Sequence, residues 1–135
     1  MKFVILATGT RGDVQPFVAL AQGLRAAGHE AVLAAPVSFE SFVRSHGVDF
    51  FPMGGDYAAL LESPEAQAAL RGNPVKMMQV VRQTVFPMMR RMLEDAWAAA
   101  QGADALVYHP KALAGAHLAE RLQVPCFIGA PVPAV

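Results

Sequence analysis

Residues 2–30 read KFVILATGTRGDVQPFVALAQGLRAAGHE, and this stretch decides the fold. The apolar run Val4–Ala7 predicts a buried strand, which a turn with two glycines follows. Apolar residues then recur at helical spacing from Val14 until Gly28, which is expected to cap the helix. Open α/β folds bind ligands beyond the carboxyl ends of such strands. We therefore expect the functional site in the turn, residues 9–13.

The same alternation of strand and helix continues along the chain. Residues 56–74 indicate short helices or loop, and Pro87 should kink or split the helix that contains it. Strands are expected at residues 31–35, 48–52, 104–108 and 125–129, and helices at 38–46, 75–100 and 112–122. This pattern predicts an α/β fold with a Rossmann-like, doubly wound parallel sheet, in one domain that covers residues 1–135.

The composition limits the classes of function. The chain has 135 residues, a formal net charge of +0 and 54% hydrophobic residues, which is typical of one globular domain. The sequence has no basic run and no aromatic residues interleaved with basic ones, so nucleic acid is not expected as a partner. No apolar run approaches the ~18 residues of a membrane span. The sequence therefore predicts a soluble, cytoplasmic protein and leaves a peripheral membrane contact open. The single cysteine, Cys126, is expected to be a small buried hydrophobic residue.

The turn GTRGDVQP is not a dinucleotide-binding fingerprint, because Gly9 and Gly12 lack the G-x-G-x-x-G spacing. Two interpretations of the glycines stay open. In the first, the two glycines let the backbone and the helix start approach an anion. In the second, they only make the turn. Arg11 likewise either holds an anion or lies in solvent.

Asp13 stands at the start of the first predicted helix and also has two interpretations. As an N-cap, its carboxylate would accept hydrogen bonds from the first amides of the helix. As a general base, it would take a proton from a substrate hydroxyl while that oxygen attacks an electrophile. A free aspartate, with a pKa of ~3.9, is a weak base unless burial raises its pKa or the proton moves late in the transition state.

Three stretches of the chain resemble one known family of enzymes. They are VILATGTRGDVQPFVALAQGLRAAGHEAVLAAP (residues 4–36), FVRSHGVDFFPMGGD (42–56) and DALVYHPKALAGAHLAERLQVPCFIGAPVPAV (104–135). The chain is similar to family 28 and family 1 glycosyltransferases of GT-B fold, in particular to sterol glucosyltransferases and those of glycopeptide-antibiotic pathways. The core G-[ST]-R-G-D-V-x-P, which begins here at Gly9, is the most specific part of the resemblance.

The resemblance implies that the chain is the N-terminal, acceptor-binding half of a GT-B glycosyltransferase. Such an enzyme transfers a hexose with inversion from a nucleotide diphosphate sugar, such as a UDP-sugar, to a lipophilic or natural-product hydroxyl, without metal or other cofactor. The nucleotide-binding C-terminal domain is absent from these residues, so the fragment alone should be inactive. The family's base falls on Asp13, where macrolide-type relatives carry a histidine. The alternative is a non-catalytic small-molecule-binding module of the same fold.

The resemblance also extends the set of candidate site residues. His109 ends the strand 104–108 at the same sheet edge as Asp13, where it would line the acceptor pocket or assist the base. The methionine-rich stretch 77–97 is either a core face at helical spacing or a wall of that pocket. The candidates for acceptor binding are His109, Met78, Phe86 and Met89, and those for the turn that meets the donor phosphates are Gly9, Thr10, Arg11 and Gly12. No two of the histidines have the spacing of a metal site.

Overall fold

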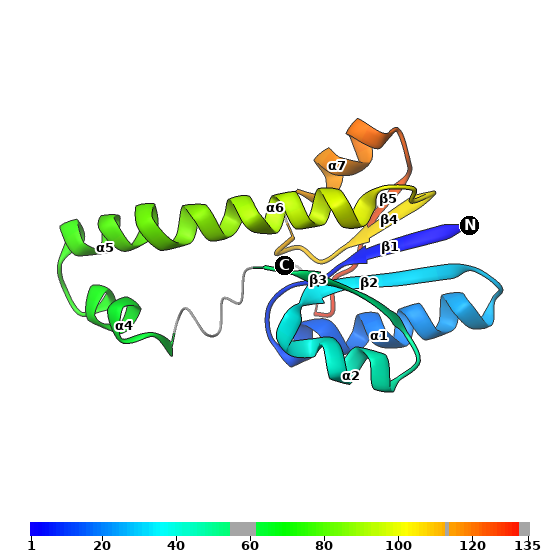
Figure 1. Ribbon diagram of the computed structural model, residues 1–135, viewed down its shortest axis with the longest axis horizontal. Coiled ribbons are helices and arrows are strands. Elements are labelled where there is room, and N and C mark those ends of the chain that lie inside the picture. The colour runs from blue at the N-terminus through cyan, green and yellow to red at the C-terminus, as the bar shows by residue number, and fades with distance from the viewer. Residues whose placement is uncertain (55–61, 113, 133–135) are drawn as a thin grey trace.

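The computed structural model describes residues 1–54, 62–112 and 114–132, and it contains one parallel sheet (Figure 1). The strand order is β3-β2-β1-β4-β5. The strands are β1 (Lys2–Leu6), β2 (Glu30–Pro36), β3 (Asp49–Met53), β4 (Ala105–Tyr108) and β5 (Cys126–Ile128). All four pairings are parallel. The chain moves outward from β1 to β3 and then returns to place β4 on the other side of β1. This confirms the predicted Rossmann-like fold and puts its switch point between β1 and β4.

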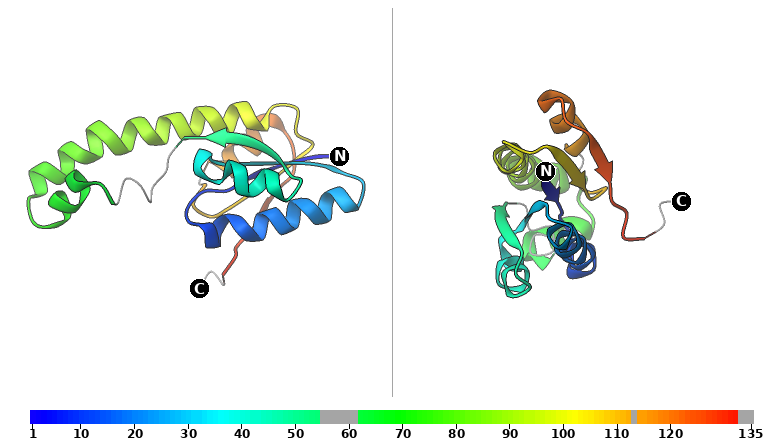
Figure 2. Two further views of the ribbon diagram at one scale, coloured as in Figure 1. Left: turned by 60° about the horizontal axis from the view of Figure 1, so that its bottom comes forward. Right: turned by 90° about the vertical axis from the view of Figure 1, so that its right-hand side faces the viewer.

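Helices cover both faces of the sheet, as the continuous apolar strands predict (Figures 1 and 2). One face carries α1 (Arg11–Ala26) and α2 (Glu40–Ser45), which follows the short 3₁₀ turn η1 (Val37–Phe39). The other face carries α6 (Phe86–Ala100) and α7 (Gly115–Leu122).

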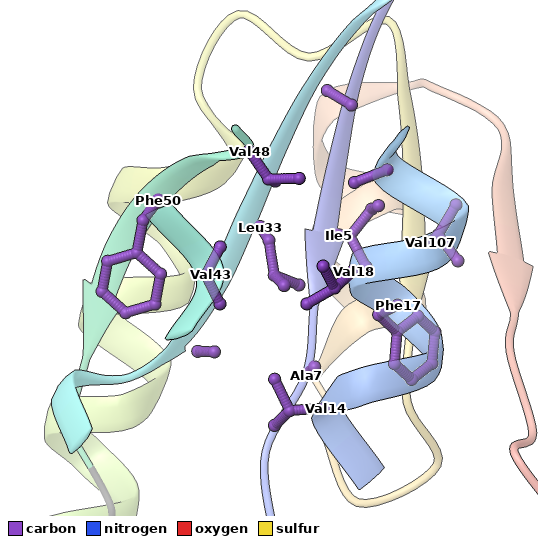
Figure 3. Packing of buried hydrophobic residues seen from close by; sticks show 13 residues of the cluster. Ile5, Ala7, Val14, Phe17, Val18, Leu33, Val43, Val48, Phe50 and Val107 are labelled. Carbon is purple, nitrogen blue, oxygen red and sulfur yellow. The ribbon is translucent and has the colours of Figure 1, made fainter. Parts of the chain in front are cut away.

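Side chains alternate along β1, and they divide the core into two clusters. Ile5 belongs to the cluster beneath α1 that also contains Ala7, Val14, Phe17 and Val18 (Figure 3). Its neighbours Val4 and Leu6 join the cluster beneath α6 and α7. The sheet is therefore buried on both sides, and only its edges and strand ends are open to ligands.

The long helical pattern over 75–100 is present but interrupted. It consists of α5 (Pro74–Val80), a π turn η2 (Val81–Val85) and α6, with α4 (Pro64–Leu70) before it. Pro87 has no amide N–H, and its ring crowds the carbonyl one turn earlier, so the preceding turn widens. We call residues 71–93 the helical arm. Its α5 end extends well beyond the sheet (Figure 1).

Two expectations from the sequence are wrong at the level of single residues. Helix α1 begins at Arg11 with Thr10 as its N-cap, so Asp13 is the third helical residue and not the cap. Cys126 is exposed rather than buried, because β5 is the edge strand and its three residues are all exposed in the part of the chain that the structure describes. The stretch 56–74 is confirmed as helical at α4, while residues 55–61 lie outside the described residues.

Substituting Gly115 with alanine should destabilise the domain by about 1–3 kcal/mol, because the site has no room for a methyl group. A Cβ atom there would overlap the Tyr108 ring and would lie 2.6 Å from the Tyr108 Cβ atom. Urea unfolding measures the effect. The control is Gly23→Ala in α1, where no atom lies within 4 Å and alanine should be neutral or stabilising. Equal unfolding free energies for wild type and Gly115→Ala would contradict the packing of α7 on β4.

Candidate active site

The carboxyl ends of β1 and β4 bring three charged or polar side chains together. The backbone N–H of His109 donates to the carbonyl of Leu6 at 2.8 Å, which continues the β1–β4 pairing past Tyr108. His109 Nε2 consequently lies 3.1 Å from Asp13 Oδ1, and Lys111 Nζ donates to Asp13 Oδ2 at 2.9 Å. The structure therefore brings Asp13 and His109 together at one sheet edge, as the sequence predicts.

The turn before α1 holds the Asp13 carboxylate in place. The backbone amide of Thr10 donates to Asp13 Oδ2 at 2.9 Å, and the Thr10 hydroxyl lies 3.2 Å from the same oxygen. Gly9 has φ +116°, and a Cβ atom there would overlap the carboxylate. Gly9 is thus required because Asp13 folds back onto the turn. At Gly12 an added Cβ would meet only Thr10 Oγ1, at 3.8 Å, so local packing does not require a glycine.

The surroundings of Asp13 favour its ionised form. Burial alone would raise the pKa of the carboxyl group, but hydrogen bonds from Lys111 and from the Thr10 amide, with the charge of Lys111, lower that pKa from 3.8 to about 2. The Asp13 side chain is 19% exposed, so these contacts act in a partly desolvated place. Burial therefore does not make Asp13 a stronger base, and a catalytic role requires that the proton moves late.

His109 is almost completely buried, and both of its ring nitrogens have partners. Its Nδ1 atom accepts the backbone N–H of Lys111 at 2.9 Å, which leaves Nε2 to carry the proton and donate to Asp13. The ring also meets Phe17 edge-on, with centroids 5.9 Å apart. In this arrangement His109 orients the carboxylate and has no free lone pair for a substrate proton.

A cleft of about 240 Å³ adjoins these residues and is almost entirely apolar. It lies between α6, the ends of β1 and β3, and the segment that leads into α7, and we call it the apolar cleft. Its lining residues are Leu6, Met53, Met89, Arg90, Met92, Leu93, Ala96, Lys111, Ala112, Ala114 and Gly115. Lys111 belongs to both the cleft and the charged cluster. Asp13 and His109 do not line the cleft, so Lys111 is the residue that connects the two.

The structure separates the predicted acceptor residues. Met89 lines the apolar cleft, while Phe86 lines a second, more polar cleft with Arg82, Arg90 and Arg91. Met78 lies in neither cleft and is 60% exposed. The interpretation of the whole stretch 77–97 as a core face is wrong, because α6 buries its alanines and leaves most of its large residues exposed.

Two further positions differ from the sequence analysis. The guanidinium of Arg11 lies over the ring of Phe42, 4.8 Å from its centroid, a contact that neither interpretation of Arg11 included. The sequence analysis assigned no role to Lys111. The available signal was its position two residues after His109, in the run His-Pro-Lys that leaves β4.

Two features of the described ranges 1–54, 62–112 and 114–132 concern metal ions and membranes. Within them, no group of three or more His, Cys, Asp or Glu residues is arranged to hold a metal ion. No helix among them has the length and hydropathy needed to cross a membrane.

Sequence comparisons agree with the architecture. Residues 3–134 match the model of the glycosyltransferase family 28 N-terminal domain. The sterol 3-beta-glucosyltransferase of Eremothecium gossypii is 39% identical over 131 residues, which are 97% of this chain and 10% of that protein. The enzyme of the same name from Emericella nidulans is 37% identical over 145 residues. This match covers 98% of this chain and 9% of that enzyme. The chain thus spans about a tenth of the length of these relatives.

Solved structures share the fold at lower sequence identity. CalG4, the calicheamicin glycosyltransferase, has a TM-score of 0.76 at 20% identity and covers 98% of this chain and 33% of its own. SnogD from Streptomyces nogalater has a TM-score of 0.71 at 24% identity, and the match covers 99% of this chain and 35% of SnogD. These likenesses concern the fold alone. With the family match over nearly its whole length, the chain belongs to the glycosyltransferase family 28 N-terminal domain family, and its sheet is that of a GT-B N-terminal domain.

Proposed function

We propose that this chain is the acceptor-binding domain of a cytoplasmic, inverting, metal-independent glycosyltransferase. The enzyme would move a hexose from a nucleotide diphosphate sugar to the hydroxyl of a lipophilic acceptor. The observation that carries the proposal is that Lys111, which lines the apolar cleft, also binds the ionised Asp13. The names of the fungal relatives make a sterol hydroxyl the first acceptor to test.

The proposed step uses the free side of the Asp13 carboxylate. Asp13 Oδ1 receives a hydrogen bond from His109 and has a second lone pair, to which the acceptor hydroxyl would donate. The acceptor oxygen forms a bond to the anomeric carbon, and the bond from that carbon to the diphosphate oxygen breaks, its electron pair leaving with the diphosphate. Attack from the opposite side inverts the anomeric carbon.

The low pKa of Asp13 sets the timing of the proton transfer. Once the new bond to the anomeric carbon is largely formed, the acceptor oxygen carries positive charge and its proton is strongly acidic. A carboxylate whose pKa is about 2 can accept the proton at that stage. Asp13 would thus act as a base late in the transition state, and His109 would hold it in position.

The nucleotide diphosphate sugar belongs, in this proposal, to a second domain of the full-length protein. Thr10 and Arg11 lie at the N-terminus of α1, where backbone amides favour an anion, and we assign the donor's phosphate side to this turn from Gly9 to Gly12. The isolated domain would accordingly bind the donor weakly and transfer no sugar.

Product analysis tests the proposal. The full-length protein is incubated with UDP-glucose and ergosterol, and the product's anomeric configuration is read by NMR, with and without EDTA. We expect a glucoside of inverted configuration whose yield EDTA leaves unchanged. A retained configuration or an EDTA-sensitive rate would contradict the mechanism. Sterol binding without any product from several donors would favour the non-catalytic module.

A peripheral membrane contact is the second part of the proposal, and the helical arm supports it. Residues 71–93 contain five basic side chains and no acidic one, although the chain as a whole is neutral. The arm also exposes large apolar side chains, among them Met78, Phe86 and Met89. Exposed apolar residues interspersed with cations are typical of surfaces that lie on anionic bilayers. A lipophilic acceptor would then reach the apolar cleft along α6.

Substituting Arg82 with glutamate should weaken binding of the domain to anionic vesicles by about tenfold or more, since each charge near the surface contributes about 1 kcal/mol. Co-sedimentation with phosphatidylcholine vesicles, with and without phosphatidylserine, measures it. Arg121→Glu, an exposed position on α7, is the control and should change little. Equal binding to both kinds of vesicle would rule out the electrostatic contact.

A further inference from the structure

We propose that Lys111 is a positioning residue that couples the apolar cleft to Asp13. Its ammonium group binds Asp13 in the free protein and leaves it when an acceptor fills the cleft. This inference rests on the proposed function, in which Asp13 takes the acceptor's proton.

Three contacts of this one residue carry the inference. Its backbone N–H donates to His109 Nδ1 at 2.9 Å, its ammonium donates to Asp13 Oδ2 at 2.9 Å, and it lines the apolar cleft. Its neighbours in sequence hold the backbone, because His109 is buried and Ala112 donates to the His109 carbonyl at 2.8 Å. The Lys111 side chain is 55% exposed. The backbone is thus fixed while the side chain has room to move.

In the free state, Lys111 is one of several contacts that make Asp13 a weak base. Among the described residues, the charged and titratable groups in contact with Asp13 are His109 and Lys111, and the Thr10 amide donates to it as well. Every one of these donors favours the ionised carboxylate. Only the lysine ammonium can leave without disturbing the turn or the buried histidine. Loss of that one donor would make Asp13 a better proton acceptor.

Acceptor binding supplies a reason for the ammonium to leave. An apolar molecule in the cleft packs against the methylene stem of Lys111 and removes water from that side. The acceptor takes up space beside the stem, so the stem turns outward and carries its ammonium toward solvent. The lysine end of the ion pair is exposed, so water can replace the carboxylate as the partner of the ammonium.

Carboxyl NMR on the 135-residue chain tests the contact without any activity. The pKa of Asp13 is compared in the wild type, in Lys111→Met, which keeps an unbranched stem, and in Lys111→Arg, which keeps the charge. We expect the pKa to rise by about one unit or more in Lys111→Met and to stay near the wild-type value in Lys111→Arg. An unchanged pKa in Lys111→Met would overturn the inference.

A second titration tests the coupling to the cleft. Ergosterol delivered by methyl-β-cyclodextrin should raise the pKa of Asp13 in the wild type and leave it unchanged in Lys111→Met, with cyclodextrin alone as the control. Binding of the sterol with no change of the wild-type pKa would overturn the coupling.

Kinetics of the full-length protein separate this inference from the proposed function. Lys111→Met should lower the acceptor KM by about two- to fivefold, because binding no longer breaks the ion pair, and should change kcat less than it changes KM. A large loss of kcat would overturn the positioning role. Failure of Asp13 itself as the base would show separately, as undiminished turnover of Asp13→Asn.

Discussion

Replacing Asp13 with asparagine should lower the turnover number of the full-length protein by about 10²-fold or more, because an amide cannot take the acceptor's proton. Initial rates at saturating donor and acceptor measure the loss. The matched control is Asp104→Asn. Asp104 also accepts a backbone amide, from Lys2, but it does so at the opposite end of the sheet. Its substitution should leave turnover within a few-fold of wild type.

The same substitution also has a structural effect that the sequence does not predict. Asparagine caps helices about as well as aspartate, so an N-cap at Asp13 would tolerate it. In the structure, however, Asp13 accepts hydrogen bonds from Thr10, His109 and Lys111, and the NH₂ group of an asparagine would face one of these donors. We expect a loss of about 1–3 kcal/mol in the free energy of unfolding. Rates must therefore be expressed per folded molecule, and full turnover of the folded variant would rule out Asp13 as the base.

Filling the apolar cleft should raise the KM for a lipophilic acceptor by about tenfold or more, which corresponds to about 1.4 kcal/mol. Ala96 is 6% exposed and lines the cleft from α6, so Ala96→Phe would place a ring in the space that the acceptor needs. The KM for the donor should not change. Steady-state kinetics with each substrate varied in turn give both constants.

Ala98→Phe provides the control for this substitution, because Ala98 is an exposed residue of the same helix. Circular dichroism melting should accompany the kinetics, since overpacking costs about 1–3 kcal/mol in a filled core. An unchanged acceptor KM in folded Ala96→Phe would place the acceptor outside this cleft. The second cleft, with Phe86 and Arg82, would then be the next position to test.

Most of the fold could be predicted because its strands and turns have local signals. The apolar runs mark the five strands, and glycines with positive φ end α1 at Gly28 and α2 at Gly47, as expected. The start of α1 was misplaced because Thr10 and Asp13 are both good capping residues. Their spacing is that of a capping box, in which the first residue is the cap and the fourth folds back onto it.

The sequence predicts only the part of the site that the order of the strands determines. Asp13 and His109 follow neighbouring parallel strands, so their proximity follows from the topology. The direction of the Lys111 side chain depends on the loop after β4, which no periodic pattern describes.

The core-face interpretation of the methionine-rich stretch fails for a reason of length. The helical run over residues 74–100 is about 40 Å long, whereas the five residues of β1 span about 17 Å. The helix must therefore extend beyond the sheet, and periodicity alone does not show which end does so.

The π turn Val81–Val85 has a consequence for which way the arm faces. A π turn closes its hydrogen bonds over one more residue than an α turn, so it shifts the helical phase of everything before it relative to α6. One residue corresponds to about 100° of rotation around a helix. The side chains of α5 therefore do not continue the face that α6 packs on β3 and β1. The proline that widens the backbone thereby sets the direction in which Lys76 of α5 faces, about three turns away from the proline itself.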